Sequence, residues 1–421
     1  MSAVPILFLQ LIAILGVARL LSAVLRHVHQ PPVIGEMLAG IVLGPLVFGC
    51  LSPHWQAALF PLDSLAALEG LSELGLVLFM FVVGAELRLP GGARRHLGAS
   101  GAIGLACVLL PCALGLAIAP FLHSRFAPQG VAFWPFALFM AASLSITAFP
   151  VMARILKERG MTESAEGRLA LTSAAFDNVF AGFVIALALI SSRTDWERFA
   201  FTLGGSLVLV GFAIWILRPA LARGFERYAD DGRPTPAMLC LLLILVFAAA
   251  AATRALGLHE VFGAFLIGAI LPRDNRLLAC LVERIEHLAV IVLMPVFFAL
   301  AGLHMSADAF SGAGWLALGL VLVAAMAGKV VGGALGARHA GLAWPQALSV
   351  GALMNARGLM ELIIMKIGLD LGVIDGAIFT MLMIMAVATT LMTTPLLALF
   401  GRLGRTTQPH AQAVRNPRSL P

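Results

Sequence analysis

Charged side chains are scarce in this sequence, and their scarcity limits what the chain can be. Asp, Glu, Lys and Arg make up 12% of the 421 residues, whereas hydrophobic residues make up 60%. Ordinary soluble domains contain about 25% charged residues, so this composition excludes a soluble globular enzyme. No polar region is long enough for a soluble domain either, since the longest loop that we expect covers residues 218–235.

Motifs of enzyme chemistry are missing too. The five cysteines lack the paired spacing of metal sites, and no Ser/His/Asp, Cys/His or paired-His group stands at a spacing typical of catalysis. No glycine-rich nucleotide-binding unit follows the apolar part of the chain. These absences argue against a membrane enzyme, and we expect no cofactor and no bound metal other than a transported ion.

Long apolar runs are what the sequence has in abundance. A helix that crosses a bilayer needs about 20 consecutive apolar residues. We count roughly 13 runs of spanning length, at residues 4–24, 31–50, 66–87, 99–121, 132–153, 169–191, 199–217, 236–253, 258–272, 288–303, 313–335, 343–366 and 375–401. The sequence therefore predicts an all-α polytopic protein of the lipid bilayer with about 13 transmembrane helices.

The distribution of basic residues predicts the orientation of these segments. The loops that follow odd-numbered segments, together with the C-terminal tail, hold 20 of the 28 Lys and Arg residues. Because cytoplasmic loops carry the excess of positive charge, we expect the N-terminus outside and the C-terminus in the cytoplasm. The same bias accounts for the net charge of +6, so we expect no nucleic-acid partner.

Two of the segments contain residues that disfavour a continuous helix. Segment five (132–153) contains Pro150, which cannot donate a hydrogen bond to the carbonyl four residues earlier. Segment twelve (343–366) contains the polar Asn355 and the helix-weakening Gly358 in mid-span. We therefore expect both helices to be interrupted inside the membrane.

The interrupted segments are the fifth and the twelfth, so they are seven segments apart. Because this number is odd, they cross the membrane in opposite directions, which predicts inverted repeats. We expect one repeat at about residues 1–191 and the other at about 236–402, with segment seven as the linker. Interrupted helices at matching positions of inverted repeats indicate the midplane binding site of a transporter. The transmembrane domain is expected to cover residues 1–402, and residues 403–421 to form a disordered cytoplasmic tail.

Asp177, followed by Asn178, places a carboxylate inside the apolar run of segment six. An ionisable group at that depth is costly and by default marks an ion or proton pathway. Lys329 in segment eleven is its natural partner, because an unpaired buried charge would be neutralised. A cation that arrives at Asp177 would then displace the ammonium, which would release a proton. Alternatively, the long side chain of Lys329 extends to the cytoplasmic interface.

Arg357 and Glu361 are spaced i, i+4 and share one helix face if the helix is not broken between them. Either they form a static structural bridge, or Arg357 supplies a fixed positive charge to the half-helix ends that meet at the crossover. Glu260 is expected at the membrane interface. The roles of Glu36 and Glu73 stay open.

With these residues, the chain resembles the monovalent cation:proton antiporter superfamily, and within it the second subfamily of Kef-type and bacterial sodium/proton exchangers. The resemblance covers nearly all of residues 1–402. Each matching stretch is apolar and only modestly specific, but their order along the chain is highly specific. The stretches are residues 30–40, 43–45, 78–87, 143–154, 262–268, 295–298 and 354–361.

The resemblance implies a sodium/proton antiporter fold, in which a mobile core of six helices contains two crossing interrupted helices beside a dimerisation part. It also implies elevator-like alternating access and a homodimer. Family members carry two adjacent polar residues on the helix after the first interrupted one, and Asp177-Asn178 falls on that pair. Lys329 falls on a lysine that bridges to the first residue of the pair in some members. The second residue is normally the ion-binding and proton-carrying Asp, so Asn178 departs from the family pattern.

These considerations lead to one set of expected roles. We expect Asp177 and Lys329 to couple transport to protons, Asp177, Asn178, Ser143 and Thr147 to bind the ion, and Asn355, Arg357 and Glu361 to provide structural charge and polarity at the crossover.

Together with this resemblance, the sequence predicts a secondary-active antiporter of the bacterial inner membrane that exchanges Na⁺ or K⁺ for protons, and the resemblance implies that it is a homodimer. Because of Asn178, two other interpretations stay open: a transport-silent regulatory homologue, or a proton-coupled exporter of an organic solute on the same scaffold. The choice among Na⁺, K⁺ and Li⁺ does not follow from the sequence, since carboxylates and carbonyls suit all three.

Overall fold

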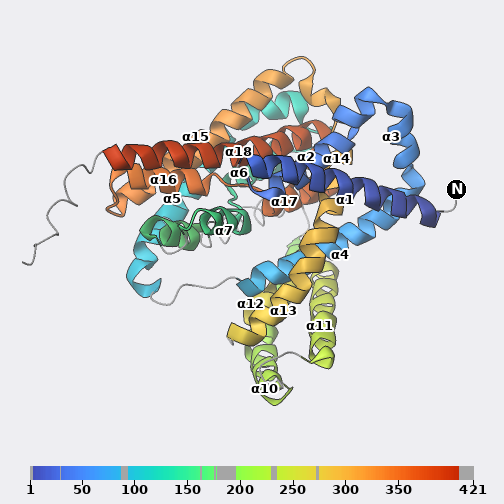
Figure 1. Cartoon of the computed structure of the whole chain (residues 1–421), viewed down its shortest axis with the longest axis vertical. Helices are drawn as coiled ribbons and strands as arrows, with labels where there is room; N and C mark the ends of the chain where they lie inside the picture. Colours follow the sequence, from blue (N-terminus) through green and yellow to red (C-terminus); the bar gives the residue numbers. More distant parts are fainter. Residues whose placement is uncertain are drawn as a thin grey trace, which may run out of the picture. The chain divides into compact units, whose positions relative to one another are not determined.

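The computed structural model describes residues 3–28, 30–86, 93–161, 164–174, 177, 196–228, 235–271 and 275–406. Every regular element within these residues is a helix (Figure 1). Nine helices of this described part are long and apolar enough to cross a membrane. The chain is therefore a multi-pass membrane protein, and its helices group into two compact units.

The first unit comprises Met1–Val28, Pro32–Leu89 and Leu189–Asp308. Its α-helices are α1 (Ala3–His27), α2 (Pro32–Leu43), α3 (Pro53–Leu59), α4 (Leu62–Glu86), α9 (Trp196–Phe212), α10 (Arg218–Tyr228), α11 (Pro236–Ala255), α12 (Val261–Ile270), α13 (Asn275–Leu288) and α14 (Met294–Leu303). Three short π-helical turns accompany them: η1 (Pro45–Gly49), η2 (Ala213–Leu217) and η3 (Ala289–Leu293). The unit is thus built from two distant parts of the sequence.

Two helix pairs in the first unit cross so closely that only glycine fits at the contact. In the α2–α14 pair, a Cβ atom on Gly40 would lie 2.0 Å from the carbonyl oxygen of Phe298. In the α4–α12 pair, a Cβ atom on Gly84 would lie 2.3 Å from the carbonyl oxygen of Phe265. Small residues allow membrane helices to pack through their backbones. These contacts join N-terminal helices to helices from the middle of the chain.

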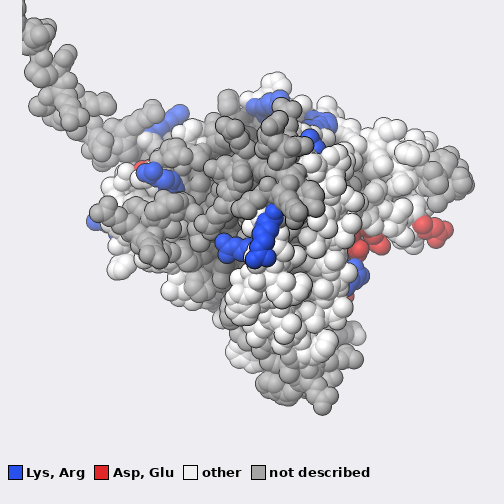
Figure 2. Space-filling view, turned by 90° about the horizontal axis from the view of Figure 1, so that it is seen from below, with Lys and Arg blue, Asp and Glu red and all other residues white. Residues whose placement is uncertain are grey.

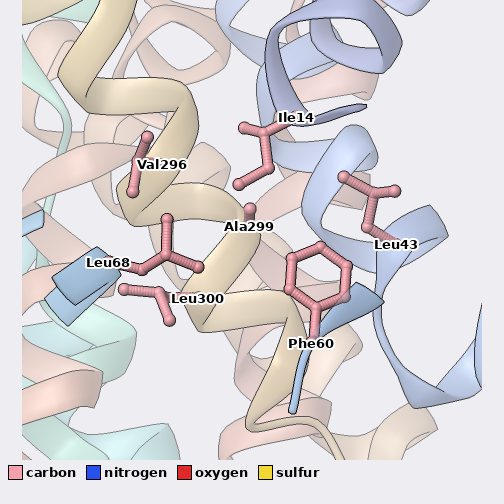
Figure 3. Packing of buried hydrophobic residues seen from close by; sticks show 7 residues of the cluster. All are labelled: Ile14, Leu43, Phe60, Leu68, Val296, Ala299 and Leu300. Carbon is pink, nitrogen blue, oxygen red and sulfur yellow. The ribbon is translucent and has the colours of Figure 1, made fainter. Parts of the chain in front are cut away.

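Apolar side chains fill the space between α14 and the N-terminal helices. Figure 3 shows seven of them, whose side chains point toward one another: Ile14, Leu43, Phe60, Leu68, Val296, Ala299 and Leu300. Each is at most 6% exposed. Their burial, six from α1, α2, α4 and α14 and Phe60 from the end of α3, stabilises this part of the first unit.

The outer surface of the described residues is largely apolar as well. On the face shown in Figure 2, most of the described surface carries neither acidic nor basic side chains. Val208 on α9 is 73% exposed and Trp215 on η2 is 80% exposed. Apolar surface of this extent is typical of contact with lipid or with another protein rather than with water.

The second unit comprises His29–Pro31, Pro90–Ala188 and Ala309–Pro421. The short 3₁₀ helix η4 (Ala307–Phe310) spans the point at which the chain enters this unit for the last time. Residues 165–174 and Asp177 are helical too. The other helices are α5 (Ala93–Phe126), α6 (Phe133–Ser145), α7 (Phe149–Glu158), α15 (Gly314–His339), α16 (Trp344–Met354), α17 (Leu359–Asp370) and α18 (Gly376–Thr406).

α5 and α15 pack closely against each other in the second unit. Gly328, Gly332 and Gly336 repeat every fourth residue along α15 and face α5. A Cβ atom on Gly332 would lie 2.7 Å from the carbonyl oxygen of Ala106. This close packing fixes the position of α15, which carries Lys329.

Both predicted interruptions are present in the second unit. α6 ends at Ser145 and α7 begins at Phe149, while α16 ends at Met354 and α17 begins at Leu359. The sequence signals at Pro150 and at 355–358 are thus confirmed. Two short stretches of non-helical backbone expose peptide groups inside the unit, where they need partners.

Some predicted boundaries are wrong. The expected loop 218–235 is helical up to Tyr228, because its Ala, Leu and Arg residues favour a helix that continues beyond the apolar run. The tenth segment begins earlier, since the amphipathic α13 leads directly into η3 and α14. The last helix continues to Thr406, whereas its candidate membrane span ends at Arg402, so the expected bounds of the membrane domain stay a prediction. Most of segment six, and residues 407–421 of the expected tail, lie outside the described residues.

Candidate functional site

Asp177 and Lys329 form a buried ion pair in the second unit. Nζ of Lys329 lies 2.8 Å from Oδ2 and 3.1 Å from Oδ1 of Asp177. Neither side chain has any exposed surface. The structure thus brings together the two residues that the sequence suggested as partners. The alternative in which Lys329 extends to the cytoplasmic interface is wrong, because its ammonium is held in the interior.

The ammonium of Lys329 also binds the break between α6 and α7. It donates to the backbone oxygen of Ser145 and, at 2.7 Å, to Oγ1 of Thr147. Ser145 is the last residue of α6, and the last four carbonyls of a helix have no donor within the helix. A positive charge is also favourable at a helix C-terminus. The break therefore stabilises the position of Lys329 in addition to Asp177.

Arg357 binds the same end of α6 from the second break. Its Nη1 lies 2.9 Å from the backbone oxygen of Ser143, and its Nη2 lies 2.5 Å from that of Leu144. Nη1 also lies 2.7 Å from Oε1 of Glu361. Both interpretations of the Arg357–Glu361 pair therefore describe part of its geometry. Lys329 and Arg357 together bind three successive carbonyls at the end of α6.

The two breaks also bind each other through their backbones. The N–H of Ala148 donates to the carbonyl of Ala356 at 2.9 Å. Oγ1 of Thr147 donates to the carbonyl of Met354, the last residue of α16, at 3.1 Å. These bonds satisfy peptide groups that the interruption of the helices leaves without helical partners. A shift of one break would therefore disturb the other.

α18 holds the second break from its other side. Oγ1 of Thr390 accepts the N–H of Arg357 at 2.9 Å and lies 2.8 Å from the carbonyl oxygen of the same residue. Nδ2 of Asn355 donates to the carbonyl of Thr389 at 3.0 Å. All four residues are fully buried. Two adjacent threonines of one long helix thus fix the backbone around Arg357.

Several buried oxygen atoms near the breaks have no hydrogen-bond partner within the described part of the chain. They are Ser143 Oγ, Asn355 Oδ1 and Glu361 Oε2. Buried polar atoms are normally paired with protein groups or with ordered water. Oxygen atoms of this kind are also the ligands that hard cations prefer. The second unit therefore holds buried oxygen atoms of a kind that can bind a cation.

Comparison with known proteins now identifies the family. Residues 11–399 match the family model described as sodium/hydrogen exchanger, transmembrane. The chain belongs to the sodium/hydrogen exchanger family. It is accordingly a membrane transporter of the secondary type and not an enzyme, as the missing catalytic motifs predicted.

Individual members of the family resemble the chain to different extents. It is 39% identical to the Na⁺/H⁺ antiporter NhaS4 of Synechocystis sp. over 389 residues, which are 92% of this chain and 95% of that protein. It is 31% identical to K⁺/H⁺ antiporter 1 of Saccharomyces cerevisiae over 94% of this chain but only 46% of that protein. The chain thus spans nearly the whole Synechocystis relative and about half the length of the yeast one.

A solved structure of a sodium proton antiporter resembles the fold over nearly its whole length. The sodium proton antiporter MjNhaP1 from Methanocaldococcus jannaschii matches with a TM-score of 0.65 at 15% sequence identity. The match covers 96% of this chain and 98% of that one. The predicted antiporter fold is therefore confirmed, while the number of 13 helices stays a prediction.

The remaining candidate residues of the exchanger lie in different places. Asn178 lies outside the described residues. In the first unit, Nη1 of Arg254 lies 3.6 Å from carboxylate oxygens of both Glu73 and Glu260. Glu36 is also a residue of this unit and is buried.

Sequence reasoning missed three residues that contribute to the site. Ser145 supplies a carbonyl to Lys329, and Thr389 and Thr390 hold the second break. A signal for the threonines existed, since they form an adjacent polar pair inside the apolar run 375–401. Nothing in the sequence indicated which carbonyl of α6 would face Lys329.

Proposed function

We propose that this exchanger is a secondary-active antiporter that exchanges Na⁺ or K⁺ for protons by alternating access. The observation that carries the proposal is the buried pair of Asp177 and Lys329 against the first break. It joins a carboxylate that can bind a monovalent cation to an amine that can release a proton. The similarity to a Na⁺/H⁺ antiporter and to a K⁺/H⁺ antiporter supports the same exchange.

The proposed cycle is a competition between a cation and an ammonium for one carboxylate. A cation that enters from the cytoplasm binds Asp177 and displaces Lys329, which releases its proton to the cytoplasm. Oγ1 of Thr147 and the unpaired hydroxyl of Ser143 complete the set of oxygen ligands. When the site opens outward, the cation leaves and Lys329 takes up a proton and re-forms the pair. The cation thus moves out while the proton moves in.

In this proposal Asn178 is a ligand but not an acid. An amide cannot titrate, but its carbonyl oxygen can bind a cation. Asp177 is then the carboxylate that alternates between Lys329 and the ion. Arg357, Glu361 and Asn355 act as fixed groups of the crossover, because a guanidinium keeps its charge throughout the cycle.

The two other interpretations receive less support. A transport-silent homologue was suggested by Asn178 alone, whereas the titratable pair of Asp177 and Lys329 is intact. The similarity to a named Na⁺/H⁺ antiporter over nearly its full length also favours transport. For an organic solute, no contact at the described site speaks in its favour over a monovalent ion.

We also propose that the protein lies in a bacterial inner membrane as a homodimer, with the N-terminus outside and the C-terminus in the cytoplasm. The basic residues in the expected cytoplasmic loops support this orientation. The 39% identity to an antiporter of Synechocystis sp. supports a bacterial transporter. The homodimer is supported by the family resemblance.

The glycine contacts of the first unit support the proposed inverted repeats. In repeats offset by seven segments, α2 corresponds to α12 and α4 corresponds to α14. The α2–α14 pair then has the α12–α4 pair as its counterpart. Both pairs cross with glycine against a backbone carbonyl, which is the correspondence that inverted repeats predict.

Transport in proteoliposomes tests the proposal. Purified protein is reconstituted with a pH-sensitive dye inside the vesicles, and Na⁺ or K⁺ is added outside. We expect cation-driven proton movement in the wild type and in Glu73→Gln, which removes an acid of the first unit. We expect none in Asp177→Asn. Equal activity of Asp177→Asn and the wild type would refute the mechanism, and no movement in the wild type between about pH 6 and 9 would favour the silent homologue.

A further inference from the structure

Pro395 leaves a gap in the hydrogen bonding of α18. The residue lies inside this helix, and proline has no N–H to donate to the carbonyl four residues earlier. That carbonyl belongs to Leu391, which is half-buried. A carbonyl without a donor is costly in a membrane protein, because no bulk water replaces the missing bond. Leu391 therefore needs a donor from outside the helix.

Gln30 supplies that donor from the opposite end of the sequence. Its Nε2 lies 3.2 Å from the carbonyl oxygen of Leu391, across 361 positions of the chain. Gln30 is 9% exposed and lies between α1 and α2. Those helices belong to the first unit, but Gln30 groups with α18 in the second. A side chain of the α1–α2 connection thus fills the gap that Pro395 creates.

The carbonyl that Gln30 binds lies next to the residues that hold the second break. Thr390 and Thr389 directly precede Leu391 and bind Arg357 and Asn355. The second break is in turn bonded to the first through Thr147 and Ala148. Contacts therefore run without interruption from Gln30 through α18 and both breaks to the hydroxyl that binds Lys329.

We propose that Gln30 is a positioning residue for the cation site. By giving Leu391 the hydrogen bond that Pro395 removes, it fixes the backbone of α18 at Thr389 and Thr390 and, through them, the crossover. The effect on cation binding rests on the proposed antiport. The coupling between Gln30 and Pro395 is independent of transport and can be measured by stability alone.

The test is a double-mutant cycle with a matched control. Gln30→Met removes the amide while keeping the side-chain length, and Pro395→Ala gives residue 395 an N–H that can bind Leu391. The control is Gln10→Met. Gln10 is a buried glutamine of the first unit whose amide donates to the carbonyl of Leu59 at 2.9 Å. Wild type, each variant and both combinations with Pro395→Ala are compared in thermal unfolding and in proteoliposome exchange.

We expect Gln30→Met to lower the Tm in the wild-type background and to lower it much less in the Pro395→Ala background, where Leu391 has a backbone donor. We also expect Gln30→Met to raise the apparent KM for the cation several-fold with a smaller change in maximal rate, and Pro395→Ala to suppress that rise. Gln10→Met should lower the Tm, leave the KM unchanged and show no coupling to Pro395→Ala.

Three results would overturn the inference. A Tm loss from Gln30→Met that is equal in both backgrounds would show that Gln30 does not replace the bond lost at Pro395. A coupled Tm loss with an unchanged KM would refute the positioning role. A wild type without any exchange would overturn the proposed function and with it that role, while the Tm comparison would still decide the Gln30–Leu391 bond.

Discussion

The two breaks of the second unit differ in the basic side chain that binds at each of them. The first is bound by Lys329, whose partner Asp177 lies 152 positions away in the chain. The second contains Arg357, whose partner Glu361 lies four residues further on. A lysine can release its proton, whereas an arginine keeps its charge. The core thus contains one basic side chain that can lose its charge, Lys329, and one that keeps it, Arg357. We infer that proton coupling takes place at the first break.

Removing Lys329, the basic side chain that can release a proton, should have the largest effect on stability. Lys329→Ala leaves Asp177 buried without its partner, and we expect the free energy of unfolding to fall by about 3–5 kcal/mol. Lys329→Ala combined with Asp177→Asn should recover much of this loss, because neither charge then remains. Thermal unfolding of the four proteins measures the coupling. Losses that simply add would contradict the pairing of the two residues.

Replacing Arg357, the basic side chain that keeps its charge, should lower stability by less and leave the pH optimum nearly unchanged. Arg357→Lys keeps the charge but cannot bind Ser143, Leu144 and Glu361 together, so we expect a loss of about 2 kcal/mol of stability. The pH optimum of exchange should move by less than about one unit, because Arg357 does not titrate in the cycle. A larger displacement of the pH profile would show that Arg357 takes part in proton transfer, against the distinction between the breaks.

Weakening the contact between α18 and the second break should lower stability by less than the change at Arg357 does. Thr390→Val keeps the shape of the side chain but removes the hydroxyl that bonds the backbone of Arg357, at a cost of about 1–2 kcal/mol. Thr253→Val is the matched control, since the Thr253 hydroxyl donates to carbonyls of its own helix in the first unit. Equal Tm losses for the two variants would show that α18 does not hold the break.

The smallest disturbance is expected from Asn178→Asp. This change restores the second acid of the family pattern beside Asp177, so cation-driven proton movement should persist or increase. Proteoliposome exchange of the variant and the wild type measures the effect. Abolished exchange at unchanged protein content and Tm would mean that the amide itself is required, and the first break would then work differently from the proposal.

Much of the site could be predicted from the sequence because its physical signals are strong. Pro150 disfavours a continuous helix in its apolar run, and the break lies directly before α7, which contains it. Asn355 to Gly358 interrupt the other helix. Asp177 and Lys329 each need a partner inside the membrane, so their pairing followed from the cost of isolated charges.

What could not be predicted depends on how the helices pack. The carbonyl of Ser145 and the hydroxyl of Thr390 become partners of the site only through the positions of α15 and α18. Gln30 and Leu391 carry no pattern that links them. The helix up to Tyr228 was missed for another reason, since a search for apolar runs does not detect an amphipathic helix with many basic residues.

The central claim is that a cation and the ammonium of Lys329 compete for Asp177. Proton release on cation binding tests it most directly: Na⁺ or K⁺ is added to purified protein in weakly buffered detergent solution, and the pH is recorded. We predict that the wild type and Arg357→Lys release protons and that Lys329→Met does not. Absence of release from the wild type, or equal release from Lys329→Met, would contradict the account.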